Sequence, residues 1–127
     1  MRLLLDTNRY TDLVAHDLDV SERIQRADEV FLSLITVGEL LAGFSLGSKR
    51  QRNEDRLRQL FDSQRVGLLL PDGTTAQFYA EVSSQLRRRG TPIPTNDMWI
   101  AAQALQYGLA LDTRDVHFQQ VPGLTLV

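Results

Sequence analysis

The chain has 127 residues, of which 24% are charged, and this length and composition are typical of one folded domain. It contains no cysteine and only two histidines, which excludes disulfides, thiolate metal sites and an imidazole-rich zinc centre. A net charge of −2 excludes an overall basic surface for avid, non-specific binding of nucleic acid.

Predicted strands and helices alternate along the chain. Residues 3–5 form an apolar run without polar alternation, which is typical of a strand buried on both faces. Further strands are expected at residues 30–33, 66–70, 109–111 and 123–127. Helical spacing of apolar residues predicts helices at 9–15, 18–27, 35–47, 50–63, 74–89 and 95–107. A loop with one glycine and two prolines separates the last two helices.

This alternation predicts the fold class. Strands followed by helices form βα units, which build a parallel sheet with right-handed crossovers. We therefore expect a single three-layer α/β domain over residues 1–127, with a central parallel sheet of four to five strands flanked by helices. No secretion leader and no apolar run of membrane-spanning length is present, so we expect a soluble cytoplasmic protein without a membrane partner.

Four acidic residues lie outside the visibly solvated helix segments. Asp6 ends the first strand, Glu39 lies in the first turn of the helix after the second strand, and Asp115 lies just beyond the fourth strand. Because the carboxyl ends of parallel strands share one edge of the sheet, we expect these three carboxylates in one crevice. Asp97 begins the apolar helix after the proline loop, but it follows no strand, so periodicity alone does not bring it there.

Each of these residues also has a purely structural interpretation. Asp6 is a good helix cap, and Thr36 with Glu39 matches the Thr-x-x-Glu capping box. Asp97 suits the dipole of its helix, and Asp115 can open a turn. Carboxylates that converge on one edge nevertheless repel each other unless a cation joins them. With so few nitrogen and sulfur ligands in the chain, Mg²⁺ or Mn²⁺ held by oxygen is the expected cofactor.

Four segments carry a resemblance to a known family: Asp6-Thr7-Asn8 after an apolar strand, TVGELLAG, NDMWIAAQAL and LDTRDVHFQQVPGL. In the order and spacing of these segments, the chain resembles the PIN-domain ribonucleases. More narrowly, it resembles the VapC-type toxins of bacterial type II toxin–antitoxin pairs. The likeness extends from the first strand to the last and so covers essentially the whole chain.

The resemblance implies a metal-dependent endoribonuclease that hydrolyses RNA phosphodiester bonds. Its acidic quartet, both catalytic and metal-binding, would be Asp6, Glu39, Asp97 and Asp115. One or two Mg²⁺ or Mn²⁺ ions on this quartet would lower the pKa of a bound water and steady the attacking and leaving oxygens. The family's small polar positions around the metal fall on Thr7, Asn8 and Thr113.

Asp112 departs from the family's pattern. It ends the fourth strand, where relatives usually carry an apolar residue. It is either a fifth acidic group near the metal or a side chain that points away. Because Asp115 matches the Thr-Arg-Asp pattern better, we assign the quartet position to Asp115 and keep Asp112 as a secondary candidate.

Five arginines are candidates for contacts with RNA phosphates. Arg9 and Arg114 lie close in sequence to predicted metal ligands, and a guanidinium can bind phosphate oxygens bidentately. The alternative for both is a salt bridge to the acidic cluster itself. Arg87, Arg88 and Arg89 either follow an RNA backbone or only complement the dipole at a helix end.

Three residues near the predicted quartet have a simpler interpretation. His117 lies among polar neighbours and is interpreted as a surface histidine in a turn. Met98 and Trp99 belong to an apolar helix and are interpreted as core residues rather than a base-stacking platform.

The resemblance also implies partners. Besides RNA, we expect a homodimer and a cognate antitoxin whose C-terminal segment enters the active-site groove, giving a toxin–antitoxin hetero-oligomer. Six apolar residues exceed what one face of a short helical hairpin buries, and they either form a partner groove or pack against the core. They are Leu40, Leu41, Phe44, Leu57, Leu60 and Phe61.

Three other functions remain as alternatives. A catalytically inactive PIN-like module would bind protein or RNA without cutting it, but all four acidic positions are filled. A structure-specific DNA nuclease would need longer insertions than this chain has room for. A phosphoacceptor receiver-like domain would need a lysine near its last strands, whereas the only lysine here is Lys49.

Overall fold

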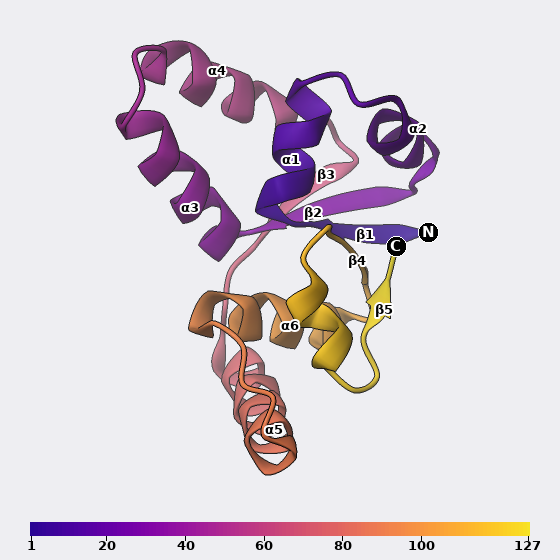
Figure 1. Ribbon diagram of the computed structural model, residues 1–127. Coiled ribbons are helices and arrows are strands. Elements are labelled where there is room, and N and C mark those ends of the chain that lie inside the picture. Colours follow the sequence, from indigo (N-terminus) through magenta and orange to yellow (C-terminus); the bar gives the residue numbers. More distant parts are fainter.

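A five-stranded parallel sheet forms the centre of the computed structural model, which describes residues 1–127 (Figure 1). Its strands have the spatial order β3-β2-β1-β4-β5. Their bounds are β1 Arg2–Leu5, β2 Glu29–Ser33, β3 Val66–Leu69, β4 Ala110–Asp112 and β5 Thr125–Leu126. The three-layer α/β fold and all five predicted strands are confirmed, with ends that differ by one or two residues.

Strand β1 lies in the middle because its apolar side chains are buried on both faces. Leu3 pairs with Val30 of β2 on one side and with Ala110 of β4 on the other. Leu3 and Leu5 pack into one core cluster, whereas Leu4 packs into the other. This alternation follows from the strand period of two, and it explains why a continuous apolar run is needed here.

Helices cover both faces of the sheet (Figure 1). Four of them, α1 to α4, surround the first core cluster, and α5, α6 and the short 3₁₀ helix η1 surround the second. Their bounds are α1 Thr7–Val14, α2 Leu18–Arg26, α3 Leu34–Ser45, α4 Arg50–Leu60, α5 Gly73–Arg89, α6 Thr95–Tyr107 and η1 Val116–Gln120. None of them combines the length and the apolar character that crossing a lipid bilayer requires.

The Thr-x-x-Glu capping box, one of the two interpretations of Glu39, does not form at the start of α3. Ser33 caps this helix instead, since its hydroxyl accepts a hydrogen bond of 3.1 Å from the backbone N–H of Ile35. Thr36 is therefore buried inside the helix rather than ahead of it. Glu39 lies in the second turn, not the first, so its carboxylate is not used to cap the helix.

Helices α5 and α6 pack against each other, and aromatic stacking joins them. The ring centroids of Tyr79 and Trp99 lie 4.3 Å apart with an interplanar angle of 27°. Trp99 and Met98 are half-buried, and Met98 packs against the second core cluster, which supports their interpretation as packing residues. Glycines with positive φ, Gly90 and Gly108, end α5 and α6, as the left-handed backbone there favours glycine.

Candidate active site

Asp6 lies at the carboxyl end of β1 and is the cap of α1 as well as a site candidate. Its Oδ1 accepts a hydrogen bond of 2.8 Å from the backbone N–H of Thr7. Its Oδ2 accepts hydrogen bonds of 2.7 Å from the Thr113 hydroxyl and 3.2 Å from the Asn8 amide. Burial raises the pKa of Asp6, and the nearby carboxylate of Asp115 raises it further, while these hydrogen bonds act in the opposite direction.

Thr113 and Asn8 connect the segment after β4 to the start of α1. The Thr113 hydroxyl donates to Asp6 and accepts from the Asn8 amide at 3.3 Å and from the backbone N–H of Asp115 at 3.0 Å. The Asn8 carbonyl oxygen accepts from the backbone N–H of Arg114 at 3.0 Å. All three small polar residues expected around the site thus contact its carboxylates, since the hydroxyl of Thr7 also donates to Glu39 Oε1 at 3.0 Å.

Asp97 joins this group from the first turn of α6. Its side chain is only 14% exposed, and burial is the main cause that raises its pKa to about 6. Repulsion from Asp115, Asp6 and Glu39 raises it as well. The other three carboxylates therefore lie close enough to Asp97 to act on it, although the sequence pattern alone did not bring Asp97 to this edge.

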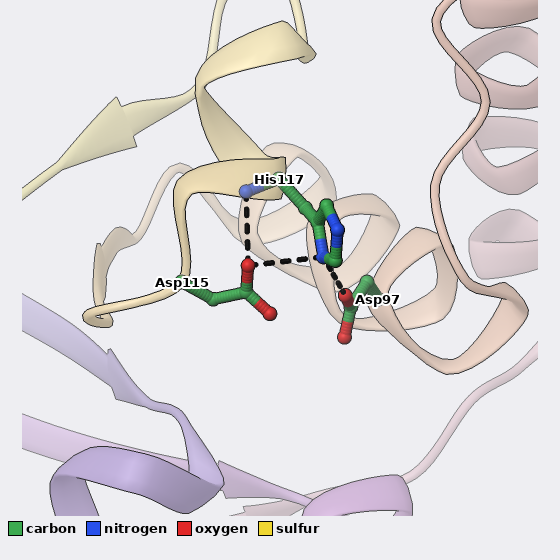
Figure 2. A group of neighbouring side chains, drawn as sticks. All are labelled: Asp97, Asp115 and His117. Atoms are coloured by element: carbon green, nitrogen blue, oxygen red, sulfur yellow. Dashed lines mark hydrogen bonds and ion pairs between the residues drawn. The ribbon is translucent and has the colours of Figure 1, made fainter.

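Asp115 and His117 complete the site from the other side (Figure 2). Asp115 caps η1, because its Oδ1 accepts a hydrogen bond of 2.9 Å from the backbone N–H of His117. The Nδ1 atom of His117 lies 3.0 Å from Asp115 Oδ1 and 3.5 Å from Asp97 Oδ2. His117 is half-exposed, as expected for a turn, but its ring faces the carboxylates, which the sequence interpretation missed. The signal that could have found it is its position two residues after Asp115, in the turn that follows a strand of the sheet.

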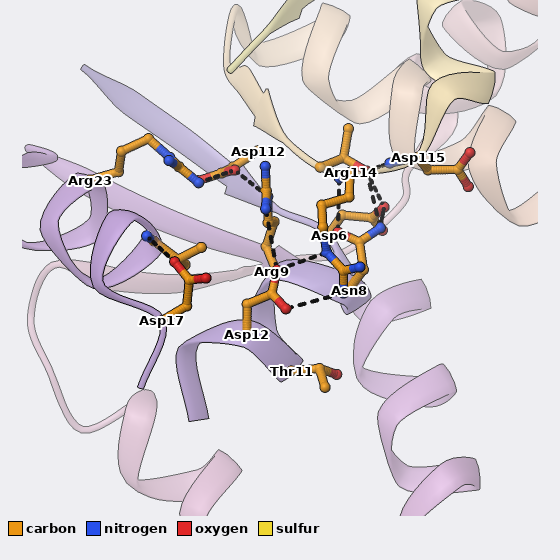
Figure 3. A network of polar contacts seen from close by, with 12 residues as sticks. Asp6, Asn8, Arg9, Thr11, Asp12, Asp17, Arg23, Asp112, Arg114 and Asp115 are labelled. Atoms are coloured by element: carbon orange, nitrogen blue, oxygen red, sulfur yellow. Dashed lines mark hydrogen bonds and ion pairs between the residues drawn. The ribbon is translucent and has the colours of Figure 1, made fainter. Parts of the chain in front are cut away.

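Asp112 is not part of this acidic cluster. Its side chain is fully buried and points toward the arginines of α1 and α2, away from Asp115 (Figure 3). Its carboxylate accepts hydrogen bonds from Arg9 Nε at 3.0 Å and from Arg23 Nε and Nη2 at 2.9 and 3.1 Å. Of the two alternatives for Asp112, the structure supports a side chain that points away from the quartet. The hydrogen bond with Asp112 is also the main cause that raises the pKa of Arg23.

Arg9 and Arg114 both form ion pairs with Asp12 of α1, a residue that the sequence analysis did not single out. Arg9 Nη1 lies 3.2 Å from Asp12 Oδ2. Arg114 binds both oxygens of the same carboxylate, with Nε at 2.8 Å and Nη2 at 3.1 Å (Figure 3). Salt bridges are therefore present, as one alternative expected, but their partners are Asp12 and Asp112 rather than the quartet.

The three arginines at the end of α5 are exposed and lie in its last turn. Arg88 Nη1 donates to the Ser84 hydroxyl at 2.9 Å, and Arg89 Nη1 donates to the backbone carbonyl of Gln120 at 3.3 Å. Arg87 and Arg88 line an open groove of about 610 Å³ together with Tyr79, Ala80, Ser83 and Ser84. Contacts of these arginines with RNA remain a prediction.

The donor set fits a divalent cation. Asp97 and Asp115 approach each other at the carboxyl edge of the sheet. Burial is the main cause that raises the pKa of Asp97, and repulsion from Asp115, Asp6 and Glu39 adds to it. A divalent cation bound between these carboxylates would neutralise their negative charge and so remove the repulsion. Side-chain ligand atoms of Asp97, Asp115 and His117 lie within 4.8 Å of one another, close enough to share one ion.

Comparisons with known proteins identify the family of the chain. Residues 3–124 match the PIN domain family. Ribonuclease VapC1 of Haemophilus influenzae strain R2866 is 32% identical over 129 residues, which cover 98% of this chain and 95% of that protein. Among solved structures, VapBC-1 from nontypeable Haemophilus influenzae has a TM-score of 0.87 at 27% identity, covering 100% of this chain and 97% of that chain. DNA-bound VapBC from Salmonella typhimurium has a TM-score of 0.89 at 25% identity, with the same coverage. Because the family match spans nearly all residues, the chain belongs to the PIN-domain family.

Proposed function

We propose that the protein is a VapC-type toxin, an endoribonuclease that depends on Mg²⁺ or Mn²⁺ and acts in the cytoplasm. The metal ligands and catalytic residues in this proposal are Asp6, Glu39, Asp97 and Asp115. The observation that carries it is the geometry at the carboxyl edge of the sheet. Side-chain ligand atoms of Asp97 and Asp115 lie within 4.8 Å of each other, and Thr113 joins Asp6 to the segment that carries Asp115. Similarity over 98% of the chain to a protein named ribonuclease VapC1 supports RNA as the substrate.

The chain's own residues would prepare the site for hydrolysis. A bound divalent ion supplies an activated water and stabilises charge on the attacking and leaving oxygens. Thr113 and Asn8 fix the orientation of the Asp6 carboxylate, and Thr7 fixes that of Glu39. This fixed arrangement lowers the cost of organising the ligands during the reaction. No side-chain nucleophile is required.

A partner protein is part of the proposal. The relatives were solved as VapBC assemblies, a family described as toxin–antitoxin systems. A groove between α3 and α4, lined in part by Val37, Leu41 and Phe61, supports an antitoxin site on this chain. Of the six apolar residues considered earlier, Leu40 and Leu57 are buried in the core, so only part of that set is available to a partner. Homodimer formation and a toxin–antitoxin hetero-oligomer are further parts of this proposal.

Cleavage of a mixed cellular RNA pool tests the proposed function. The purified protein, free of antitoxin, is incubated with Mg²⁺, with Mn²⁺ or with a chelator, beside the Asp6→Asn variant. Discrete fragments should require the metal and disappear in the variant. Asp62→Asn, an exposed carboxylate in the turn after α4, is the matched control and should cleave like the wild type. Intact RNA in every condition, from folded protein, would favour the inactive binding module instead.

A further inference from the structure

The ring of His117 faces the two carboxylates that close the candidate metal site. We propose that His117 Nδ1 is a ligand of the metal ion, beside Asp97 and Asp115. We further propose that this nitrogen makes the site favour a first-row transition ion such as Mn²⁺ over Mg²⁺. The inference rests on the metal site of the proposed function and specifies its ligand set and its ion.

Distances between the ligand atoms support a shared ion. In an octahedral site with bonds of about 2.1 Å, neighbouring ligand atoms lie about 3 Å apart. The Nδ1 atom of His117 lies 3.0 Å from Asp115 Oδ1 and 3.5 Å from Asp97 Oδ2. These separations are those of adjacent ligands, so an ion could be bound by all three residues with only small side-chain adjustments.

The local fold holds the imidazole in this position. Phe118, the next residue, is fully buried in the second core cluster and anchors η1 against the sheet. The cap from Asp115 Oδ1 to the backbone N–H of His117 fixes the first turn of η1. The ring itself is 51% exposed, so water can accept the hydrogen bond from Nε2–H. That arrangement leaves the lone pair on Nδ1, which is the tautomer required to bind a metal ion.

The chemistry of the donor atoms links the ligand to the choice of ion. Mg²⁺ prefers oxygen ligands and keeps several waters, whereas imidazole nitrogen binds first-row transition ions well. A site with only carboxylates and waters would suit Mg²⁺ as well as Mn²⁺, the two ions that the sequence composition indicated. One nitrogen in place of one water weakens that preference and favours transition ions.

The same distances from Nδ1 to Asp97 and Asp115 are also compatible with a different role for His117. If Nδ1 carries the proton, the ring donates a hydrogen bond to Asp115 and only orients that carboxylate. In the first role Nδ1 is bonded to the metal ion, and in the second it stays hydrogen-bonded to Asp115 after the ion binds. A direct measurement of nitrogen bound to the metal therefore separates them.

Pulsed electron paramagnetic resonance of bound Mn²⁺ makes this measurement. The measurement uses protein without an affinity tag, so that the only imidazoles are those of His16 and His117. Wild-type protein with Mn²⁺ should give modulation from a directly bound ¹⁴N nucleus, and labelling histidine with ¹⁵N should change that modulation. His117→Asn should lose the signal. His16→Asn, a substitution at an exposed position after α1, is the matched control and should keep it.

Calorimetric titration with Mn²⁺ and Mg²⁺ tests the preference for the ion. Loss of the ligand in His117→Asn should weaken Mn²⁺ binding roughly tenfold or more, since even outer partners of metal ligands have effects of that size. Mg²⁺ binding should change much less, so the ratio of the two affinities should fall. An unchanged ratio would contradict the proposal.

The wild-type spectrum alone can overturn the inference, even if the variants do not fold. Bound Mn²⁺ without a nitrogen signal would mean that His117 only orients Asp115, and failure of Mn²⁺ to bind would also refute the proposal. Neither measurement uses RNA. A nitrogen signal together with intact RNA in the cleavage assay would refute the ribonuclease proposal and leave the metal ligand established.

Discussion

The Thr113 hydroxyl donates a hydrogen bond of 2.7 Å to Oδ2 of Asp6, joining two residues that are 107 positions apart in the chain. This contact connects the carboxyl ends of the neighbouring strands β1 and β4, at the edge where the site lies. The hydroxyl has one proton and two acceptor lone pairs, and the structure uses all three, because Asn8 and the backbone of Asp115 donate to it. Thr113 thus fixes Asp6 and the segment that carries Asp115 in one arrangement.

Replacing Thr113 with valine should damage the site more than the fold. Valine has nearly the same shape but leaves the buried Asp6 carboxylate without its shortest hydrogen bond, so the pKa of Asp6 should rise. We expect metal affinity to fall about 10- to 100-fold and the free energy of unfolding to fall by about 1–3 kcal/mol. Calorimetry and urea denaturation measure the two effects. Thr113→Ser keeps the hydroxyl and should resemble the wild type, so an equal loss in both variants would contradict this role.

Asp112 should matter for stability and not for metal binding. It is fully buried between Arg9 and Arg23, and Asp112→Leu would leave both guanidinium groups without this partner. Loss of one partner from a buried ion pair costs about 3–5 kcal/mol. We expect the lower end of that range, since the side chains of Arg9 and Arg23 are 19% and 31% exposed and can reach water.

Urea denaturation, with metal titration of the folded fraction, checks this expectation. The metal affinity of folded Asp112→Leu protein should equal that of the wild type. A large loss of affinity would instead make Asp112 the fifth acidic group near the metal. Asp28→Asn serves as the control, because Asp28 is an exposed residue at the opposite end of the sheet, paired with the N-terminal amine, and its substitution should leave stability unchanged.

Arg114 should contribute to RNA binding through a phosphate contact. Its side chain is 54% exposed, and its guanidinium is held by Asp12, while its backbone N–H donates to the side-chain oxygen of Asn8 beside the acidic site. In the cleavage-deficient Asp6→Asn background, Arg114→Gln should weaken RNA binding at every sequence. It should also reduce the slope of log affinity against log salt concentration by about one. Arg58→Gln, on the exposed face of α4, is the control and should leave the slope unchanged.

The elements that were predictable from sequence are those with strong local signals. Helix α6 has the predicted bounds because proline precedes it and glycine follows its last turn. The predicted start of α3 differs by one residue, but Ser33, at the end of a strand, takes the capping role that the Thr-x-x-Glu pattern suggested for Thr36. Ser33 and Thr36 are both good capping residues and lie within four positions of each other. In the structure Ser33 is the cap, and Thr36 is buried inside the helix.

The site was predictable where sheet topology alone brings residues together. Asp6 and Asp115 follow neighbouring parallel strands, so their convergence needed only the rule about carboxyl ends. The ion pairs of Arg114 with Asp12 and of Arg23 with Asp112 could not be found in this way. They join residues 102 and 89 positions apart, and a sequence does not show long-range ion pairs. The side chain of His117 points toward the carboxylates because His117 lies in the 3₁₀ helix η1. The sequence of this short segment does not predict a 3₁₀ helix.

The pKa of Asp97 predicts an unusual dependence of stability on pH in metal-free protein. The folded-state pKa is raised from 3.8 to about 6, so between these values the native state keeps a proton that the unfolded chain loses. Stability therefore decreases as pH rises through this window and stays low above it. Asp97→Asn removes the carboxylate, so the variant should lack this decrease and should be more stable than the wild type above pH 6, by roughly 2–3 kcal/mol.

Thermal unfolding in the presence of a chelator, from pH 4 to pH 8, measures this difference. Added divalent metal should stabilise the wild type more strongly as pH rises, because the ion competes with the proton on Asp97. The same metal should stabilise Asp97→Asn much less. Parallel pH profiles for the two chelated proteins would contradict the buried, repelled carboxylate. Equal stabilisation of both proteins by metal would remove Asp97 from the ligand set and leave the ion to the other proposed ligands, which are Asp6, Glu39, Asp115 and His117.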